Sequence, residues 1–209
     1  MPIVNLAALA AAAVAVVPAP VQQTAVPPPD ALPHANTQSH AVGLPYAGRL
    51  VGGVPFPPEG EGFGTWDPVL KRSPNRVWRR YATVKTVSRV LSVLALYRSA
   101  NPSSPRILVG DLSRPQGGDF GRRFGGLGHA SHQNGLDVDV YYPRLDRLEH
   151  APLRPEQVDL ARAQDLVDLF LRAGAKKVFV GPNLNLRGPR GRVIPLVHHD
   201  DHLHARFGR

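Results

Sequence analysis

Gly128-His129-Ala130-Ser131-His132-Gln133-Asn134-Gly135-Leu136-Asp137-Val138-Asp139-Val140 is the stretch around which the chain is organised. A second run, His198-His199-Asp200-Asp201-His202-Leu203-His204-Ala205-Arg206-Phe207, lies close to the end of the sequence. Six of the nine histidines of the chain fall within these two runs. Imidazoles and carboxylates gathered at two separate places predict that the two runs meet at one site.

The Asn134-Gly135 pair explains how His132 and Asp139 can reach the same point. On a straight strand these residues would be roughly 23 Å apart, and on a helix about 10 Å apart along the axis. Asn-Gly tolerates positive φ and is a strong signal for a tight reversal of the chain. We therefore predict a turn after which the two side chains converge.

Apolar and polar residues alternate with a period of two after this turn and again in the second run. The apolar positions are Leu136, Val138, Val140, Leu203, Ala205 and Phe207, and the polar ones are Asp137, Asp139, Tyr141, His202, His204 and Arg206. This alternation is typical of half-buried strands with one polar face. A ligand set of His, Asp and His suits zinc with a fourth position left for water. The alternative is a solvated acidic strand face with unrelated surface histidines.

The motif Ser131-His132-Gln133-Asn134-Gly135-Leu136-Asp137-Val138-Asp139, followed by His199-Asp200-Asp201-His202-Leu203-His204, resembles the penicillin-insensitive murein endopeptidases. Those enzymes belong to a wider zinc peptidase group with the D-Ala-D-Ala peptidases, lysostaphin-like enzymes and the zinc domain of Hedgehog proteins. The H-x6-D and H-x-H pattern of the group is matched at every position. Gly110-Asp111-Leu112-Ser113 and Gly117-Gly118 also resemble the endopeptidase branch, and the similarity covers roughly residues 48–207.

This resemblance implies that His132, Asp139 and His204 hold the metal, a choice that geometry alone leaves open among five histidines of the two runs. His202 is the expected general base, because it precedes His204 by two residues on one strand face. Asp201 is its rival, since an acidic base occupies the corresponding position in the D-Ala-D-Ala peptidase branch.

Several further residues are expected to surround the metal ligands. His129 and His199 would support ligands or bind substrate, and Asp137 would orient a ligand imidazole or simply be solvated. A glycine-rich loop, residues 114–128, follows a predicted buried strand at 106–113 and is a candidate substrate wall. Within this region Ser113 and Arg114 are candidates to bind a substrate carboxylate.

The first 47 residues differ in composition from the rest of the chain. Residues 1–17 form an alanine-rich apolar run, which is typical of a signal segment and too short for a stable membrane span, although no Lys or Arg precedes it. The alternative is a disordered tail of a cytoplasmic protein. Residues 18–47 are rich in Pro and Ala and predict a flexible linker. We expect a single peptidase domain over residues 48–209 of a protein exported to the periplasm or cell wall.

The net charge of +9 indicates attraction to polyanions, although part of it can serve solubility alone. No basic and aromatic residues interleave in a nucleic-acid-binding motif, so we expect no nucleic acid partner. Anionic cell-wall polymer and the carboxylates of peptidoglycan stem peptides fit an exported protein better. The absence of cysteine excludes disulfides and thiolate metal sites.

The predicted elements favour an α+β domain with a mixed, largely antiparallel central sheet flanked by helices. Helices are expected over residues 82–99 and 155–174, and further strands over 177–181 and 193–197. The aromatic loop over residues 55–81 is expected to pack against the domain rather than to bind glycan.

By resemblance, the expected activity is cleavage of the D-alanyl to meso-diaminopimelyl cross-link of peptidoglycan by a zinc endopeptidase. A D,D- or L,D-carboxypeptidase acting on stem peptides is one alternative. A zinc-containing module that binds the cell wall without turnover is another. The complete ligand set and His202 favour catalysis.

Overall fold

The computed structural model describes residues 38–121 and 129–209, which belong to the compact unit Pro33–Arg209. The expected signal segment and residues 18–37 of the expected linker lie outside these ranges, as do residues 122–128 of the glycine-rich loop. The elements, in chain order, are β1 (His40–Leu44), β2 (Ala47–Val51), β3 (Val54–Pro55), β4 (Glu59–Gly60), β5 (Phe63–Thr65), η2 (Val77–Arg79), β6 (Tyr81–Ala82), α1 (Val84–Ala100), β7 (Ile107–Val109), β8 (Asp137–Tyr141), η4 (Pro155–Gln157), α2 (Leu160–Arg172), β9 (Ala175–Val180), β10 (Val193–Pro195) and β11 (His202–Phe207).

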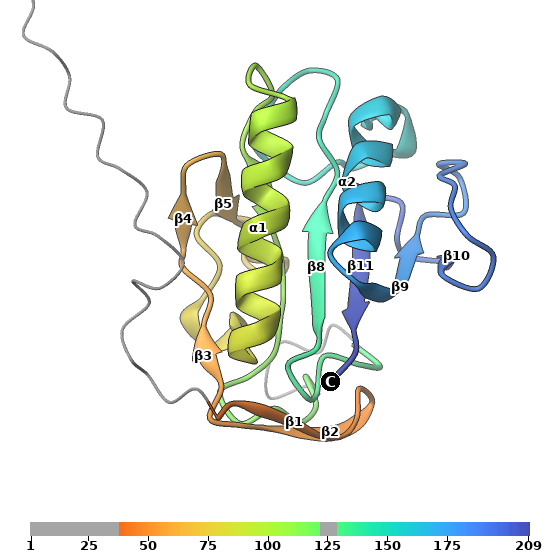
Figure 1. Ribbon diagram of the computed structural model, residues 1–209. Coiled ribbons are helices and arrows are strands. Elements are labelled where there is room, and N and C mark those ends of the chain that lie inside the picture. The colour runs from red at the N-terminus through yellow and green to blue at the C-terminus, as the bar shows by residue number, and fades with distance from the viewer. Residues whose placement is uncertain (1–37, 122–128) are drawn as a thin grey trace, which may run out of the picture. The chain divides into compact units, whose positions relative to one another are not determined.

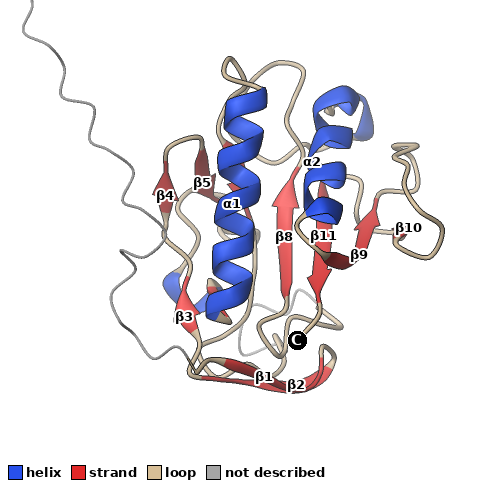
Figure 2. Ribbon diagram, viewed as in Figure 1, coloured by secondary structure: helices blue, strands red, loops and turns tan. Residues whose placement is uncertain are grey.

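Seven strands form the central sheet in the order β10-β9-β11-β8-β7-β5-β4. The pairs β10–β9 and β5–β7 are parallel, and the other four neighbouring pairs are antiparallel. The predicted α+β fold with a mixed, largely antiparallel sheet is therefore confirmed. Figure 2 shows that β8 and β11, the strands expected to carry the site, lie next to each other in the middle of this sheet.

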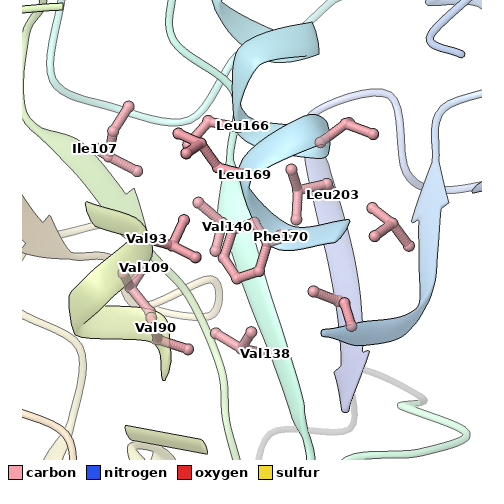
Figure 3. Packing of buried hydrophobic residues seen from close by; sticks show 14 of the residues in the cluster. Val90, Val93, Ile107, Val109, Val138, Val140, Leu166, Leu169, Phe170 and Leu203 are labelled. Atoms are coloured by element: carbon pink, nitrogen blue, oxygen red, sulfur yellow. The ribbon is translucent and has the colours of Figure 1, made fainter. Parts of the chain in front are cut away.

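Both helices cover the same face of the sheet, with α1 and α2 side by side in Figure 1. Their apolar stripes pack against the apolar positions of β8 and β11 in one core. Figure 3 shows the centre of this core, where side chains from α1, α2, β7, β8 and β11 meet, including Val90, Val93, Val109, Val138, Val140, Leu166, Phe170 and Leu203. Because strand side chains alternate, the aspartates and histidines of β8 and β11 lie on the face away from the helices.

The helices start where polar side chains satisfy free backbone N–H groups. Thr83 accepts a hydrogen bond from the N–H of Thr86 at the start of α1, and Asp159 accepts one from that of Arg162 at the start of α2. Pro155, expected to open the second helix, instead starts the short 3₁₀ turn η4, and Val158 is extended. The helix therefore begins later than predicted, because Asp159 provides the stronger N-terminal cap.

A hairpin of β1 and β2 spans the domain boundary expected at Gly48. Residues His40–Leu44 pair along their whole length with β2, although the sequence of this part predicted an unstructured linker. Backbone hydrogen bonds explain the difference: the N–H of Leu50 donates to Gln116, and the N–H of Gln133 donates to Pro45. This hairpin thus holds the loop that precedes β8, and strand pairing needs no periodic apolar pattern.

Neither described helix combines the length and the apolar character needed to cross a membrane. Within the aromatic segment, Phe56 and Phe63 are buried in the main core and Trp78 stacks on Phe120. These contacts agree with the expected packing role. Trp66 is different, because it lines a surface groove as well as packing against Tyr141 and Ala151.

Candidate metal centre and active site

The pairing of β8 with β11 brings the two histidine- and aspartate-rich runs together. In the antiparallel register, His204 lies opposite Asp139, His202 opposite Tyr141, and Arg206 opposite Asp137. Side chains of directly opposed residues share one face of the sheet. The convergence predicted from the alternating pattern is therefore present in the fold.

The turn before β8 carries His132 back over Asp139. Gly135 has φ of +75°, and a side chain there would also meet Leu50 and the backbone of Thr83. His132 itself has φ of +67°, which a residue other than glycine rarely adopts. Its backbone N–H donates to Asp137 Oδ2 at 3.0 Å, so the first carboxylate of β8 helps to hold this strained position.

Four imidazoles surround the carboxylate of Asp139. Its Oδ1 atom lies 3.2 Å from His132 Nε2, 3.5 Å from His204 Nδ1 and 3.7 Å from His202 Nε2. Its Oδ2 atom lies 4.0 Å from His129 Nδ1. His129, His132 and Asp139 each offer one possible ligand atom, and these atoms lie within 4.8 Å of one another. The described residues thus provide a nitrogen-rich centre with one carboxylate.

The outer nitrogen of each of three imidazoles hydrogen-bonds to a fixed acceptor. His132 Nδ1 is 2.6 Å from the carbonyl oxygen of Leu112, and His204 Nε2 is 3.0 Å from Asp137 Oδ1. His129 Nε2 is 2.8 Å from Asp111 Oδ2. A carbonyl or ionised carboxylate only accepts, so these outer nitrogens carry the protons and the inner nitrogens of neutral rings carry lone pairs. This is the arrangement that metal-binding histidines have in proteins.

Two facing atoms of the centre have no hydrogen-bond partner among the described residues. They are His132 Nε2 and Asp139 Oδ1, both buried. Although they lie 3.2 Å apart, they are not aligned for a hydrogen bond. Buried polar atoms are rarely left unsatisfied in this way. Once His132 has lost its second proton, a nitrogen lone pair and a carboxylate oxygen face one space, and this pair fits a divalent cation such as zinc.

The electrostatics of the centre also favour a positive charge. Burial would lower the pKa of His132, but the carboxylates of Asp139, Asp137 and Asp111 together outweigh this effect and raise it to about 9. Burial would raise the pKa of Asp139, but His132 and His202 hold it well below its ordinary value. Burial lowers the pKa of His204 to about 4, against the opposing effect of Asp137, so its ring stays neutral at neutral pH. Asp139 thus attracts positive charge, which a proton or a bound metal can supply.

His202 and its rival Asp201 are hydrogen-bonded to each other. Strand β11 starts only at His202, and the bend before it turns the Asp201 carboxylate toward His202 Nδ1, at 2.6 Å. That bond leaves His202 Nε2 as the atom nearest Asp139. Burial would lower the pKa of His202, but Asp139 and Asp201 raise it. The two residues therefore form one unit at the edge of the centre.

The other expected site residues lie at different distances from the centre. The ring of His199 lies beside that of His202, tilted with centroids 4.8 Å apart, and burial lowers the pKa of His199. Asp137 accepts from His204, from the backbone of His132 and from Arg206 Nε. Ser113 is fully buried, and Arg114 donates to the backbone of Asp119. Ser113 and Arg114 are thus not grouped with the imidazoles, and their role toward substrate stays a prediction.

Reasoning from the sequence assigned no role to Asp111, although it belongs to the segment that carries part of the family resemblance. This buried carboxylate joins His129 to Arg79, whose Nε donates to it at 2.7 Å, and also accepts from Asn75. Only tertiary structure brings these residues together. The signal available in sequence was an aspartate near the end of the predicted buried strand over residues 106–113.

Comparison with known proteins identifies the relatives of this chain. A family model described as penicillin-insensitive murein endopeptidase matches residues 41–177. The chain belongs to this family. That match ends before β11, so the last two histidines of the centre lie beyond it.

Individual relatives carry the same family name. The murein endopeptidase of Pectobacterium atrosepticum is 44% identical over half of this chain and 45% of its own length. That of Escherichia coli O157:H7 is 30% identical over 98% of this chain and 76% of its own length, and that of Haemophilus influenzae is 30% identical over 84% and 66%. The chain therefore matches less than half of the Pectobacterium murein endopeptidase and about three quarters of the Escherichia coli one.

Proposed function

We propose that this protein is a zinc endopeptidase that hydrolyses the peptide cross-links of peptidoglycan, at the D-alanyl to meso-diaminopimelyl bond. Membership of the murein endopeptidase family supports a peptidase that acts on peptidoglycan. The observation that carries the metal-dependent mechanism is the pair of unsatisfied, facing atoms, His132 Nε2 and Asp139 Oδ1.

His132, Asp139 and His204 are the proposed metal ligands, through Nε2, a carboxylate oxygen and Nδ1. His129 Nδ1 faces the same carboxylate and is available as a further ligand. A bound zinc ion would polarise the scissile carbonyl and acidify a water molecule. Positive charge there would oppose the rise in the pKa of His132, so metal binding would release its proton.

His202 is the proposed general base. Its Nε2 lies 3.7 Å from Asp139 Oδ1, while Asp201 holds the proton on its Nδ1. A neutral His202 can take the proton of the attacking water at Nε2 and then deliver it to the leaving amine when the C–N bond breaks. Asp201 keeps the ring in the tautomer and orientation that this transfer needs, so it acts by positioning His202.

Mass spectrometry of cross-linked muropeptide dimers tests the activity, the reaction type and the metal together. Incubation with the protein should convert dimers into monomers, and a chelator should stop the conversion until zinc is added back. Loss of terminal residues with the cross-link intact would instead indicate a carboxypeptidase. Binding of dimers without any product would indicate a cell-wall-binding module and contradict the proposal.

We also propose that the protein is exported to the periplasm or cell wall, where peptidoglycan is found. The alanine-rich residues 1–17 support this proposal. Cell fractionation combined with N-terminal sequencing is the test. A protein that begins at Met1 and occurs only in the cytoplasm would contradict it.

A further inference from the structure

A groove of about 700 Å³ opens beside the candidate active site. Trp66 and Lys71 line it from one segment, residues His150–Pro155 from a second, and His198, Asp200 and Asp201 from a third. All of these residues are among those that the structure describes. The function proposed above gives this groove no role.

Two contacts connect the groove to the metal centre. Asp201 lines the groove and also hydrogen-bonds to His202, whose other ring nitrogen faces Asp139. The ring of Tyr141 lies 5.7 Å from that of His202 and packs in the same apolar cluster as Ala151 and Trp66. A chain bound in the groove would therefore pass next to the proposed general base.

The groove is lined by two carboxylates that already have hydrogen-bond partners and by two cationic side chains that have none within the described part of the chain. Asp201 is bonded to His202, and Asp200 accepts from the side chain of Asn183 at 2.7 Å. Lys71 and Arg154 are exposed, and their side chains form no ion pair or hydrogen bond with the other residues that the structure describes. An anionic ligand would therefore find two cations free to bind it.

Hydrogen bonds fix the backbone turns that carry Lys71 and Arg154. The turn that carries Lys71 is closed by Asp67, whose Oδ1 accepts from the N–H groups of Val69 and Leu70, each at 2.9 Å. Lys71 has φ of +51° at the end of that turn. Next to Arg154, the side chain of Gln157 accepts from the N–H of Leu153 at 2.7 Å and from Arg144. Fixed turns lower the entropy lost when a ligand binds.

We propose that this groove binds one arm of the cross-linked stem peptide, with Lys71 and Arg154 pairing with a free carboxylate of diaminopimelate. Trp66, Ala151 and Leu153 would contact the aliphatic part of the same arm. This inference rests on the proposed peptidase function and adds a specificity-determining contact to it. A stem peptide combines short aliphatic groups with free carboxylates, which is the chemistry that the groove offers.

The test compares two muropeptide dimers that differ only in whether the diaminopimelate carboxylates are free or amidated. The double variant Lys71→Ala with Arg154→Ala should lose about tenfold in kcat/KM on the free acid, mainly through KM, as expected for two partly exposed ion pairs. On the amidated dimer, the kcat/KM of the double variant should equal that of the unmodified protein. The conservative variant Lys71→Arg with Arg154→Lys should retain the preference for the acid.

Lys85→Ala with Arg172→Ala is the matched control, because both residues are exposed on the helices that cover the other face of the sheet. It should have the same kcat/KM as the unmodified protein on both dimers.

Equal losses of the Lys71 and Arg154 double variant on both dimers, or no loss on either, would overturn the carboxylate contact while leaving the peptidase proposal intact. If the unmodified protein cleaves neither dimer, the peptidase proposal fails. Dissociation constants of the two dimers for the unmodified and double-variant proteins then decide whether the groove recognises carboxylate.

Discussion

The two faces of β8 and β11 are both largely buried but differ in how their side chains are stabilised. Val138, Val140 and Leu203 pack against the helices and are 0% exposed. On the other face, Asp139 is 4% exposed and His204 6%. Burial therefore does not distinguish the face that stabilises the fold from the face that carries the chemistry. One face is apolar, whereas the other contains buried polar atoms, and only some of these atoms have hydrogen-bond partners among the described residues.

Every buried apolar side chain adds to stability by leaving water, whereas a buried charge costs free energy unless it is paired. The polar face offsets this cost at its periphery, where Asp111 and Asp137 accept bonds from arginines and histidines. At its centre, Asp139 Oδ1 and His132 Nε2 have no partner in the described part of the protein. The periphery therefore positions the imidazoles, whereas the centre leaves two facing polar atoms unsatisfied by the described residues, which supports the cation site proposed above.

The largest effect should come from changing the proposed ligands. Asp139→Asn, His132→Ala and His204→Ala should each reduce zinc from about one ion per chain to well below that level and abolish muropeptide cleavage, because each removes one of three proposed ligands. Elemental analysis of the purified variants, together with cleavage assays, is the measurement. Val138→Ala, next to Asp139 but on the helix-facing side, should keep its zinc. Zinc that stays near one per chain in all three ligand variants would contradict the assignment.

His202→Ala should have the next largest effect and separates chemistry from metal binding. It should retain zinc but lose on the order of a hundredfold or more in turnover, as expected for a lost general base. Asp201→Ala should retain more activity, since Asp201 only holds the His202 ring through its Nδ1. Steady-state kinetics on a purified muropeptide dimer, with zinc content measured in parallel, provides the comparison. If Asp201→Ala is the inactive variant, the two roles are reversed.

Local sequence rules were sufficient for the elements that carry the site. The alternation after Asn134-Gly135 predicted β8, and the alternation of residues 202–207 predicted β11, with Leu203, Ala205 and Phe207 directed to the core. The family resemblance added a choice among the histidines. Both strands were recognisable because residues close together in the sequence determine the alternation of apolar and polar side chains and the position of a tight turn.

Features that depend on contacts between distant segments were not predictable in this way. Asp111 reaches His129 only because β7 lies next to β8 in the sheet. The hairpin formed by β1 with β2 is held by backbone bonds to Gln116 and Gln133, which leave no trace in side-chain periodicity. The bend that brings Asp201 to His202 likewise depends on where β11 begins to pair with β8.

The helix-facing side of β11 should respond to substitution in stability and not in metal binding. Leu203→Ala should cost about 2–5 kcal/mol in the free energy of unfolding, because it opens a cavity in a fully buried part of the core. Urea titration monitored by circular dichroism measures this cost. Leu96→Ala is the matched control, since Leu96 is exposed on α1 and should change stability by less than about 0.5 kcal/mol. Loss of zinc from the folded Leu203→Ala protein would show that the two faces are not independent.

The smallest effect concerns Asp67, a buried carboxylate outside both faces whose partners are all structural. Burial would raise the pKa of Asp67, but its bonds from Arg76 and from the N–H groups of Leu70 and Val69 lower it below 3.8. A lowered pKa in the folded state means that the ionised carboxylate stabilises the protein at neutral pH, and that this contribution disappears as pH falls below its ordinary pKa.

Asp67→Asn should therefore cost about 1–3 kcal/mol at pH 7, from the loss of charged hydrogen bonds to a buried group. The difference from the unmodified protein should shrink as the pH falls below 3.8. Unfolding titrations of both proteins between neutral and acid pH measure this gap, and zinc content at neutral pH should be equal. A difference in unfolding free energy that does not change with pH would mean that the charge of Asp67 contributes nothing to stability. A loss of zinc would show that the turn that carries Lys71 also supports the metal centre.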